Sequence, residues 1–233
     1  MPHLLSFISD DDLYKHTRQL VKAAQEAANR VEDDPYRNVI DPFSAVVDAA
    51  RQRISIAAWM NQEKARQTQK GFQNALGDFH QDVVGSMPGW ENAGRGGSFD
   101  VRNAKKKVIA EIKNKYNTMN ARSALSVYDS LARHLDYGDP GFKAYVVDII
   151  PKDPRPYDRP FTPSERGIRR QTRANLTQMD GKSFYKLASG ETDALLKLYQ
   201  AMPTVLSDIF KTDPKELTDP DDFMDLFTRA YIE

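Results

Sequence analysis

The chain has no cysteine, which excludes a disulfide framework and any zinc site built on thiolates. Histidine is also scarce. The four histidines (His3, His16, His80 and His134) show no metal-ligand spacing, which argues against a zinc hydrolase or a histidine-based nuclease. No apolar run is long enough to span a bilayer, and no signal peptide precedes Asp10. We therefore expect a protein of the reducing cytoplasm.

An excess of charge of either sign is missing as well, because 33 Lys and Arg residues balance 33 Asp and Glu residues. The whole molecule therefore exerts no general attraction on nucleic acid. The charges are nonetheless unevenly distributed. Basic residues gather at 105–115 and 166–173, whereas acidic residues gather at 10–12 and 213–225. A basic region on a neutral body is compatible with DNA binding.

The rest of the composition is that of an ordinary globular protein. The 233 residues are 40% hydrophobic and 28% charged, and a chain of this length can bury a substantial core. We expect one domain over 1–233. It would consist of a helical N-terminal part (1–84), a sheet core (85–152), and a basic loop followed by helices (153–233).

Patterns of apolar residues predict helices in the N-terminal part. Residues 11–31 form an amphipathic stripe, and a second helix is expected to begin after Asp41, whose side chain is suited to capping. A longer helical pattern covers 55–84, where Gly71 or Gly77 can break it into two pieces. We interpret these segments as packing helices.

The C-terminal half predicts a helix, a strand and further helices. Residues 123–135 have a helical apolar stripe, and 142–150 form a short apolar run typical of a buried strand. Residues 151–182 are rich in proline and basic groups and are expected to be a long connection, which in a compact domain is usually functional. Helices are expected again at 183–210 and 221–231.

The most informative stretch lies in the middle of the chain and reads as a β-hairpin. Residues two apart on a strand share a face, so Glu111 and Lys113 project side by side. If the chain reverses at 103–106, Asp100 lies roughly opposite Ile109, with Glu111 as its diagonal neighbour. The sequence therefore predicts two carboxylates and an ammonium group close together.

Two carboxylates that converge at a strand end suit a hard, oxygen-seeking cation such as Mg²⁺, and this is the chemistry of phosphodiester cleavage. The alternative is a solvated edge hairpin with ordinary surface charges. Ile109 argues against that alternative, because it favours burial while Glu111 and Lys113 follow at once. A strand whose first residues are buried in a core and whose last residues are charged can hold a functional site rigidly in place.

At these residues the chain resembles the PD-(D/E)XK nucleases, with Phe99-Asp100 in place of Pro-Asp and Glu111-Ile112-Lys113 as the E-x-K half. More specifically, AEIKNKYNTMN resembles the type II restriction endonucleases that cut GGNCC or GGWCC sites. The flanking segments that continue this resemblance in order are NVIDPFSA (38–45), 59–80, GSMPGW (85–90), YVVDIIPK (145–152), RPFTPS (159–164) and DGKSFYKLASG (180–190). The missing proline before Asp100 is a departure that touches no ligand atom.

The resemblance implies an α/β fold with a restriction-endonuclease-like core, in which helices flank a mixed β-sheet and further helices lie at both ends. It also implies a sequence-specific type II restriction endonuclease of a restriction–modification system. Such an enzyme uses Mg²⁺ to hydrolyse double-stranded DNA at a short palindrome and acts as a homodimer. A cognate DNA methyltransferase would act on the same site.

Roles follow for the residues of the hairpin. Asp100 and Glu111 are the expected metal ligands, with the backbone carbonyl of Ile112 as a third. Lys113 is expected to orient and deprotonate the attacking water and to stabilise charge in the transition state.

Glu63 is a further candidate, because a helix before the hairpin often supplies an extra carboxylate in related nucleases. Glu63, Arg66 and Lys70 share a helix face, so the alternative is a surface ion-pair ladder. His80, on the same helix, is expected to be a hydrogen-bonded structural residue.

Polar residues beyond the site are expected to contact phosphates or base edges of DNA. They are Asn114, Lys115, Asn117, Asn120, Arg166, Arg169, Arg170 and Arg173. The alternatives are turn formation and helix capping for the asparagines, and a solvated helix face for the arginines.

Two other functions remain open from the sequence. One is a PD-(D/E)XK repair or structure-specific nuclease, which would act without a fixed target sequence. The other is a non-catalytic DNA-binding relative. The intact set of Asp100, Glu111 and Lys113 disfavours it, because crowded carboxylates repel each other without a metal.

Overall fold

The chain folds into two compact units in the computed structural model, which describes residues 3–94, 96–214 and 220–231. Unit 1 contains the chain up to Thr17 and from His80 onward, and unit 2 is Arg18–Phe79. The expectation of a single domain stays a prediction. Part of the predicted acidic C-terminal segment, 215–219, lies outside the described residues.

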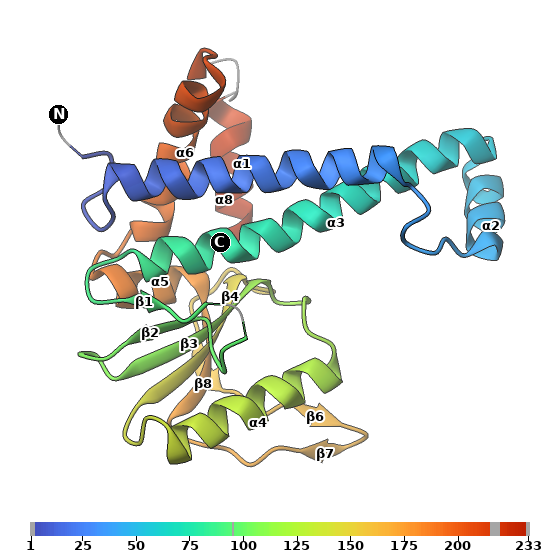
Figure 1. The fold of residues 1–233 in the computed structure, drawn as a ribbon. Coiled ribbons are helices and arrows are strands. Elements are labelled where there is room, and N and C mark those ends of the chain that lie inside the picture. The colour runs from blue at the N-terminus through green and yellow to red at the C-terminus, as the bar shows by residue number, and fades with distance from the viewer. Residues whose placement is uncertain (1–2, 95, 215–219, 232–233) are drawn as a thin grey trace. The chain divides into compact units, whose positions relative to one another are not determined.

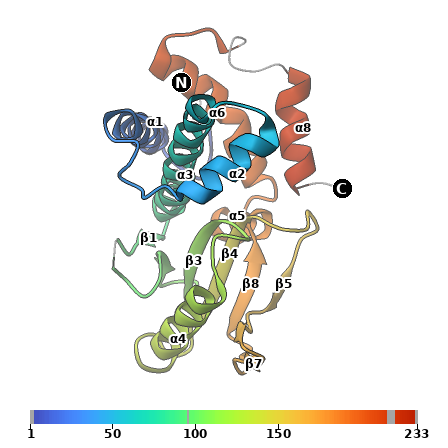
Figure 2. The same cartoon turned by 90° about the vertical axis from the view of Figure 1, so that its right-hand side faces the viewer.

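Unit 1 is built on a six-stranded mixed sheet with the strand order β1-β2-β3-β4-β8-β5 (Figure 1, Figure 2). The strands are β1 (Glu91–Asn92), β2 (Val101–Asn103), β3 (Val108–Lys115), β4 (Lys143–Ile150), β5 (Asp158–Pro160) and β8 (Leu176–Asp180). The three central strands β3, β4 and β8 run parallel, whereas the other pairings are antiparallel. The predicted mixed sheet flanked by helices is confirmed.

Helix α4 (Ala121–Tyr137) covers one face of this sheet. Its apolar stripe buries Leu131 and Leu135 against Ile109 of β3 and Val146 of β4. Because α4 connects β3 to β4, it supplies the crossover that two parallel neighbouring strands require. The core of unit 1 therefore begins directly behind the charged end of β3.

Helix α5 (Gly181–Ser189) packs against the other face, where Phe184 contacts Tyr145 of β4. Its first residue lies very close to the β4 backbone. A Cβ atom added at Gly181 would lie 2.4 Å from the carbonyl oxygen of Ile149. Only glycine permits this approach, so the sequence at the start of α5 sets how closely the helix meets the sheet.

The remaining helices discussed here are α1 (Asp10–Asp33), α2 (Pro42–Gln52), α3 (Ile56–Gly85), α6 (Ala194–Phe210) and α8 (Pro220–Tyr231). The expected break in the long helix is wrong, because α3 continues through both Gly71 and Gly77. Gly71 instead allows close helix packing, since a Cβ there would lie 2.8 Å from the Cβ of Ala27 on α1. None of the helices in the described ranges is long and apolar enough to cross a membrane.

Helix α2 begins as predicted, with Asp41 as its N-cap. The Asp41 side chain accepts hydrogen bonds from the backbone N–H groups of Phe43 and Ser44, at 2.9 and 3.3 Å. Pro42 occupies the first turn, where its missing N–H costs nothing.

The expected connection at 151–182 contains three pieces of structure that the sequence interpretation missed, and the short strand β5 is one of them. Strand β8 was missed because it has five residues, buries both faces and shows no alternation. A separate hairpin joins β6 (Ser164–Glu165) to β7 (Ile168–Arg169). The two residues between them, Arg166 and Gly167, have φ values of 51° and 82°, as the tightest hairpin turns require.

Candidate functional site

Strands β2 and β3 form the predicted hairpin, but the predicted register is wrong. Arg102, not Asp100, pairs with Ile109. Asp100 lies just before β2 and donates its backbone N–H to the carbonyl of Ala110 at 2.9 Å, so it lies beside β3 near Ala110.

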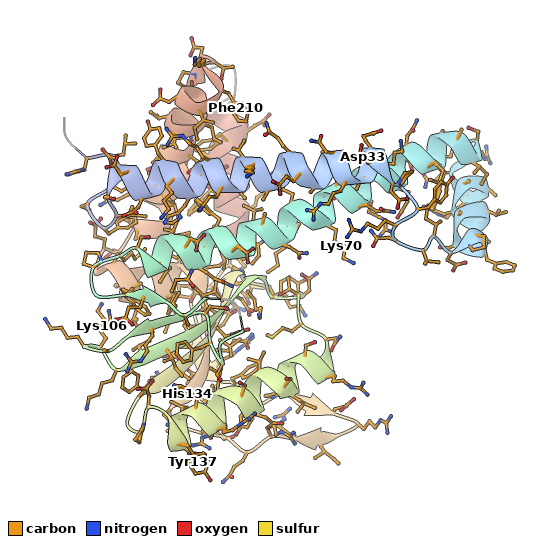
Figure 3. All side chains as sticks on the ribbon, viewed as in Figure 1. Asp33, Lys70, Lys106, His134, Tyr137 and Phe210 are labelled. Carbon is orange, nitrogen blue, oxygen red and sulfur yellow. The ribbon has the colours of Figure 1, made fainter. Side chains whose placement is uncertain are left out.

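The turn explains this shift. The four turn residues are 104–107 rather than 103–106, because Asn103 still pairs with β3. Its side-chain oxygen accepts a hydrogen bond from the N–H of Lys106 at 2.8 Å, and Lys107 adopts a left-handed conformation with φ 54°. Lys106 projects from this turn in Figure 3. An Asn side chain that mimics a backbone turn thus moves the reversal by one residue.

Asp100 is held by the backbone of β3. Its Oδ2 accepts a hydrogen bond from the N–H of Ile112 at 2.6 Å. In a strand, the N–H and the C=O of one residue leave the same edge. The carbonyl of Ile112 therefore also leaves β3 on the side of Asp100, beyond the last paired residue of β2, Val101.

Glu111 and Lys113 follow the buried start of β3 on the same face. The Nζ of Lys113 lies 2.6 Å from the Oε1 of Glu111, and both side chains are half-buried. Ile109, two residues earlier, is fully buried in the core beneath α4. The prediction for β3, that its first residues are buried and its later residues are charged, is confirmed.

The donor atoms of this site suit Mg²⁺. Among the described residues, no group of three or more His, Asp and Glu side chains forms a ready-made metal cage. Mg²⁺ does not need one, because it usually keeps several waters and binds through one or two carboxylates together with substrate phosphates. Asp100, Glu111 and the carbonyl of Ile112 offer only hard oxygen donors, so the set fits this ion.

Asp148 is a further carboxylate near the site that the sequence interpretation missed. It lies on β4 in register with Lys113. Its Oδ2 accepts hydrogen bonds from the Tyr157 hydroxyl at 2.8 Å and from the Gln178 amide at 2.6 Å, whereas Oδ1 has no partner in the described part of the chain. Burial raises the pKa of Asp148. In the sequence, Asp148 could have been found as the single carboxylate inside the apolar run 142–150.

Arg159 was missed as well. Its guanidinium lies 4.5 Å above the centre of the Tyr157 ring, and its Nε and Nη2 atoms lie 3.4 and 3.3 Å from the side-chain oxygen of Gln178. It forms no ion pair with any described residue. Arg159 lines a pocket of about 440 Å³ whose walls include Tyr116 and Phe161. The result is an exposed guanidinium beside an open pocket, held by neutral groups and close enough to Asp148 and Asp153 for their charges to attract it.

The four predicted arginines divide into two pairs and do not form a helix face. Arg170 makes two hydrogen bonds to Asp129, at 2.8 and 2.6 Å. Arg173 pairs in the same way with Asp136, and both carboxylates belong to α4. The other two arginines lie exposed in the β6–β7 hairpin. Half of the predicted cationic charge is thus already neutralised within the chain.

The polar residues after the site have different surroundings. Asn114 is buried, Lys115 is half-buried at the end of β3, and Asn117 is exposed in the following turn. Asn120 is the N-cap of α4 and accepts a hydrogen bond from the N–H of Ser123 at 2.8 Å. The capping interpretation of Asn120 is confirmed, and the DNA contacts stay predictions.

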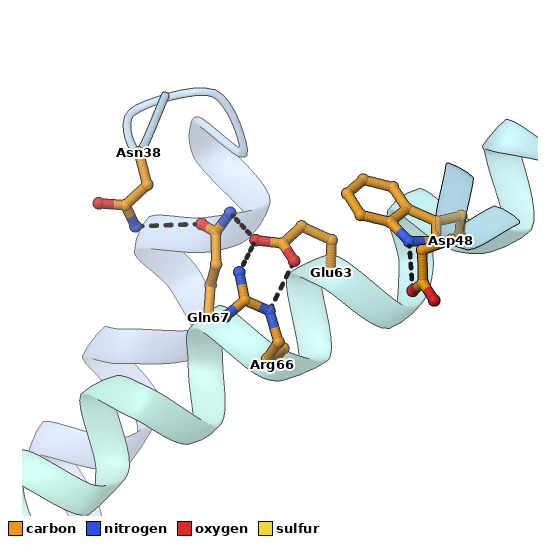
Figure 4. Close-up of polar contacts among 6 residues, drawn as sticks. Asn38, Asp48, Glu63, Arg66 and Gln67 are labelled. Atoms are coloured by element: carbon orange, nitrogen blue, oxygen red, sulfur yellow. Dashed lines mark hydrogen bonds and ion pairs between the residues drawn. The ribbon is translucent and has the colours of Figure 1, made fainter. Parts of the chain in front are cut away.

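Glu63 lies on α3 within unit 2, where its carboxylate is fully engaged (Figure 4). Arg66 donates to both of its oxygens at 2.7 Å, and Gln67 donates to Oε1 at 2.9 Å. Gln67 in turn accepts from Asn38 at 3.2 Å. The hydrogen bonds from Arg66 lower the pKa of Glu63. This network holds the loop before α2 to α3, and a role for Glu63 at a metal site stays a prediction.

Comparisons of the sequence with known proteins find two named relatives and one family. Residues 5–211 match the family model of the Eco47II restriction endonuclease. The chain is 38% identical over 237 residues to the type II restriction enzyme Eco47II of Escherichia coli, covering 98% of this chain and 99% of that protein. It is 29% identical over 214 residues to the type II restriction enzyme Sau96I of Staphylococcus aureus, covering 89% and 82%. No solved structure shows significant similarity to the chain.

Proposed function

Because the chain belongs to the Eco47II restriction endonuclease family and is a type II site-specific deoxyribonuclease, we propose that it uses Mg²⁺ to cut double-stranded DNA at a short palindrome of the GGNCC or GGWCC type. The observation that carries this proposal is the β2–β3 hairpin. There the Asp100 carboxylate is fixed to the backbone of Ile112, the residue between Glu111 and Lys113, and these two side chains form an ion pair. This arrangement supports assignment to the PD-(D/E)XK nucleases.

In the proposed mechanism, Asp100, Glu111 and the carbonyl of Ile112 hold the metal. The bound ion would polarise the scissile phosphate and lower the pKa of its bound water. Lys113 lies on the same strand face as Glu111, where its ammonium group can orient the attacking water. The same group stabilises the negative charge that builds on the phosphorane-like transition state.

Contacts to DNA are proposed from the groups that the chain leaves uncompensated. Lys115 and Asn117, just beyond β3, and the two arginines of the β6–β7 hairpin are placed at phosphates or base edges. Arg159 joins them, because a rigid guanidinium suits a bidentate contact to the O6 and N7 atoms of guanine. Arg170 and Arg173 can contact DNA only in competition with their carboxylates on α4.

We also propose a homodimer, because a two-fold symmetric target is matched by two-fold symmetry in the protein. A cognate methyltransferase that modifies the same palindrome need not bind this chain. The DNA substrate places the enzyme in the cytoplasm.

Mapping of cut ends tests the proposed function. The purified protein is incubated with a sequenced, unmethylated plasmid and Mg²⁺, and every end is sequenced. We expect discrete double-strand ends that share one short palindrome. Random nicks, or cuts only at branched DNA, would instead indicate a repair or structure-specific nuclease. No cleavage with any divalent metal would indicate a non-catalytic relative.

Thermal unfolding tests the metal site separately from cleavage. Mg²⁺ or Mn²⁺ should raise the melting temperature of the wild type, because a ligand that binds only the folded state stabilises it. The shift should be much smaller for Glu111→Ala. Asp153→Ala, at an exposed ion pair with Arg155, serves as the control and should respond like the wild type. Equal shifts of the melting temperature in all three proteins would show that Glu111 does not bind the metal.

A further inference from the structure

Helix α2 is apolar on two opposite faces, but the fold covers only one of them. One face packs through two alanines against Trp59 of α3. On the other face, Phe43, Val46 and Val47 are 82%, 59% and 68% exposed. Contiguous exposed apolar side chains on a folded protein mark interaction sites, so the second face of α2 is available for a partner.

Three more exposed apolar residues flank this helix. Tyr36 and Val39 precede α2 and are 67% and 97% exposed, and Ile56 follows it and is 48% exposed. We call these three residues, together with Phe43, Val46 and Val47, the α2 surface. Their exposed side chains amount to on the order of 700 Å², close to the about 800 Å² per partner of a standard protein interface.

The α2 surface is held in place and is not a frayed end. Asp41 caps the start of the helix. Asp48, on the side that faces α3, accepts hydrogen bonds from Arg51 at 2.7 Å and Gln52 at 2.9 Å. It also accepts one from the Trp59 indole at 3.0 Å (Figure 4). Since the helix is fixed before any partner arrives, little conformational entropy would be lost on association.

We propose that the α2 surface binds the α2 surface of a second copy of this chain. In a symmetric contact the same patch meets itself, so any uncompensated charge on it would oppose an identical charge. Between Pro42 and Ala50 the only charged residue is Asp48, and it is already neutralised by Arg51. The inference rests on the homodimer of the proposed function and assigns its surface.

Crosslinking provides the first test, because the wild-type chain has no thiol of its own. Val47→Cys introduces a single cysteine on the α2 surface. Tyr137→Cys is the control, since Tyr137 is 86% exposed at the end of α4 in unit 1 (Figure 3). Under mild oxidation at low micromolar protein, Val47→Cys should form a covalent dimer in non-reducing gels. Equal or greater crosslinking of Tyr137→Cys would overturn the proposal.

Sedimentation provides the second test. The wild type should sediment as a dimer, and Phe43→Glu/Val47→Glu should dissociate with at least a 100-fold higher dissociation constant. Tyr137→Glu should remain dimeric. Circular dichroism and the thermal shift with Mg²⁺ establish that the double variant is folded. Should that variant fail to fold, the crosslinking result decides.

The outcomes separate this inference from the proposed function. A wild type that cuts at one palindrome but is monomeric, or a folded double variant that stays dimeric, would overturn only the α2 contact. A wild type that dimerises through α2 but fails to cut would support the contact and overturn the proposed cleavage.

Discussion

Arg159 differs from the neighbouring arginines because the groups that hold it do not neutralise it. The Arg159 guanidinium lies over the Tyr157 ring and contacts the side-chain oxygen of Gln178, and both of these groups are neutral. Arg170 and Arg173 are instead each bound to a carboxylate. A guanidinium held in one plane donates two parallel hydrogen bonds only to a pair of acceptors whose spacing and direction match its two N–H groups. This favours a role in choosing the target sequence over general attraction to DNA.

Replacement of Arg159 tests that role. In a Lys113→Ala background, which we expect to prevent cleavage, Arg159→Ala should lose about 10- to 100-fold in affinity for the target duplex and little for duplexes with one guanine pair replaced. Arg159→Lys should not restore the difference. Fluorescence anisotropy with each duplex provides the measurement, with Arg170→Ala as the control. A uniform loss on every duplex would mean that Arg159 binds a phosphate.

The sequence predicted some of the site residues and missed others for physical reasons. The pairing of Glu111 and Lys113 follows from the period of a strand alone. The register of β2 against β3 follows from where the chain turns, and the hydrogen bond from Lys106 to Asn103 at that turn is recorded by no hydrophobic pattern. Asp148 escaped notice because only the folded structure shows that its partners come from distant strands.

Helix α5 meets the sheet at Gly181, and this contact leads to a prediction at the scale of elements. Gly181→Ala would place a Cβ against the backbone of Ile149, which cannot move without disturbing β4. We expect a loss of about 3 kcal/mol in the free energy of unfolding. Urea denaturation provides the measurement.

Gly77→Ala is the matched control for this change. A Cβ at Gly77 would meet nothing within 4 Å, and the residue lies in the interior of α3. Alanine there should increase the free energy of unfolding by about 0.5–1 kcal/mol, because it restricts the unfolded chain and favours the helix. Similar losses at both positions would show that the contact with Ile149 is not the cause.

Elements with a long periodic pattern or a clear cap were predictable, and short ones were not. Helix α2 follows from Asp41 and Pro42, and α4 follows from its apolar stripe. Strands β6 and β7 have two residues each, which is too short for an alternating pattern, and β8 has five residues that are buried on both faces. Proline residues around them further favour the interpretation of a loop.

The stability of the molecule should depend on pH through His80. Its Nδ1 lies 2.7 Å from the Tyr185 hydroxyl, and burial lowers its pKa to about 4. Between about pH 6.5 and pH 4 the unfolded chain binds a proton at His80 that the folded chain does not. The free energy of unfolding should therefore fall by up to roughly 3 kcal/mol as the pH decreases through this range.

Comparison of two histidine variants tests this dependence. Urea denaturation at pH 7 and pH 4.5 should show a smaller loss of stability for His80→Gln than for the wild type. His3→Gln, at an exposed position, should behave like the wild type. An unchanged pH dependence in His80→Gln would assign the acid sensitivity to other groups.

Composition alone could not predict how charge is used across the molecule. The balanced net charge predicts no general attraction to nucleic acid. It does not distinguish the arginines that α4 neutralises from those of the β6–β7 hairpin, which stay exposed. That difference depends on Asp129 and Asp136 of α4, which lie 41 and 37 residues before their arginines in the sequence.

The attachment of Asp100 to the backbone of Ile112 has a consequence for how such an enzyme can change. The position of this carboxylate depends on its contact with β3 and not on strand β5 and the β6–β7 hairpin, which carry Arg159, Arg166 and Arg169. If these arginines read the target as proposed, mutations in their segments should alter the preferred DNA sequence without rebuilding the proposed cleavage residues. Laboratory selection for a new target should concentrate its diversity at 152–175 and leave the β2–β3 hairpin unchanged.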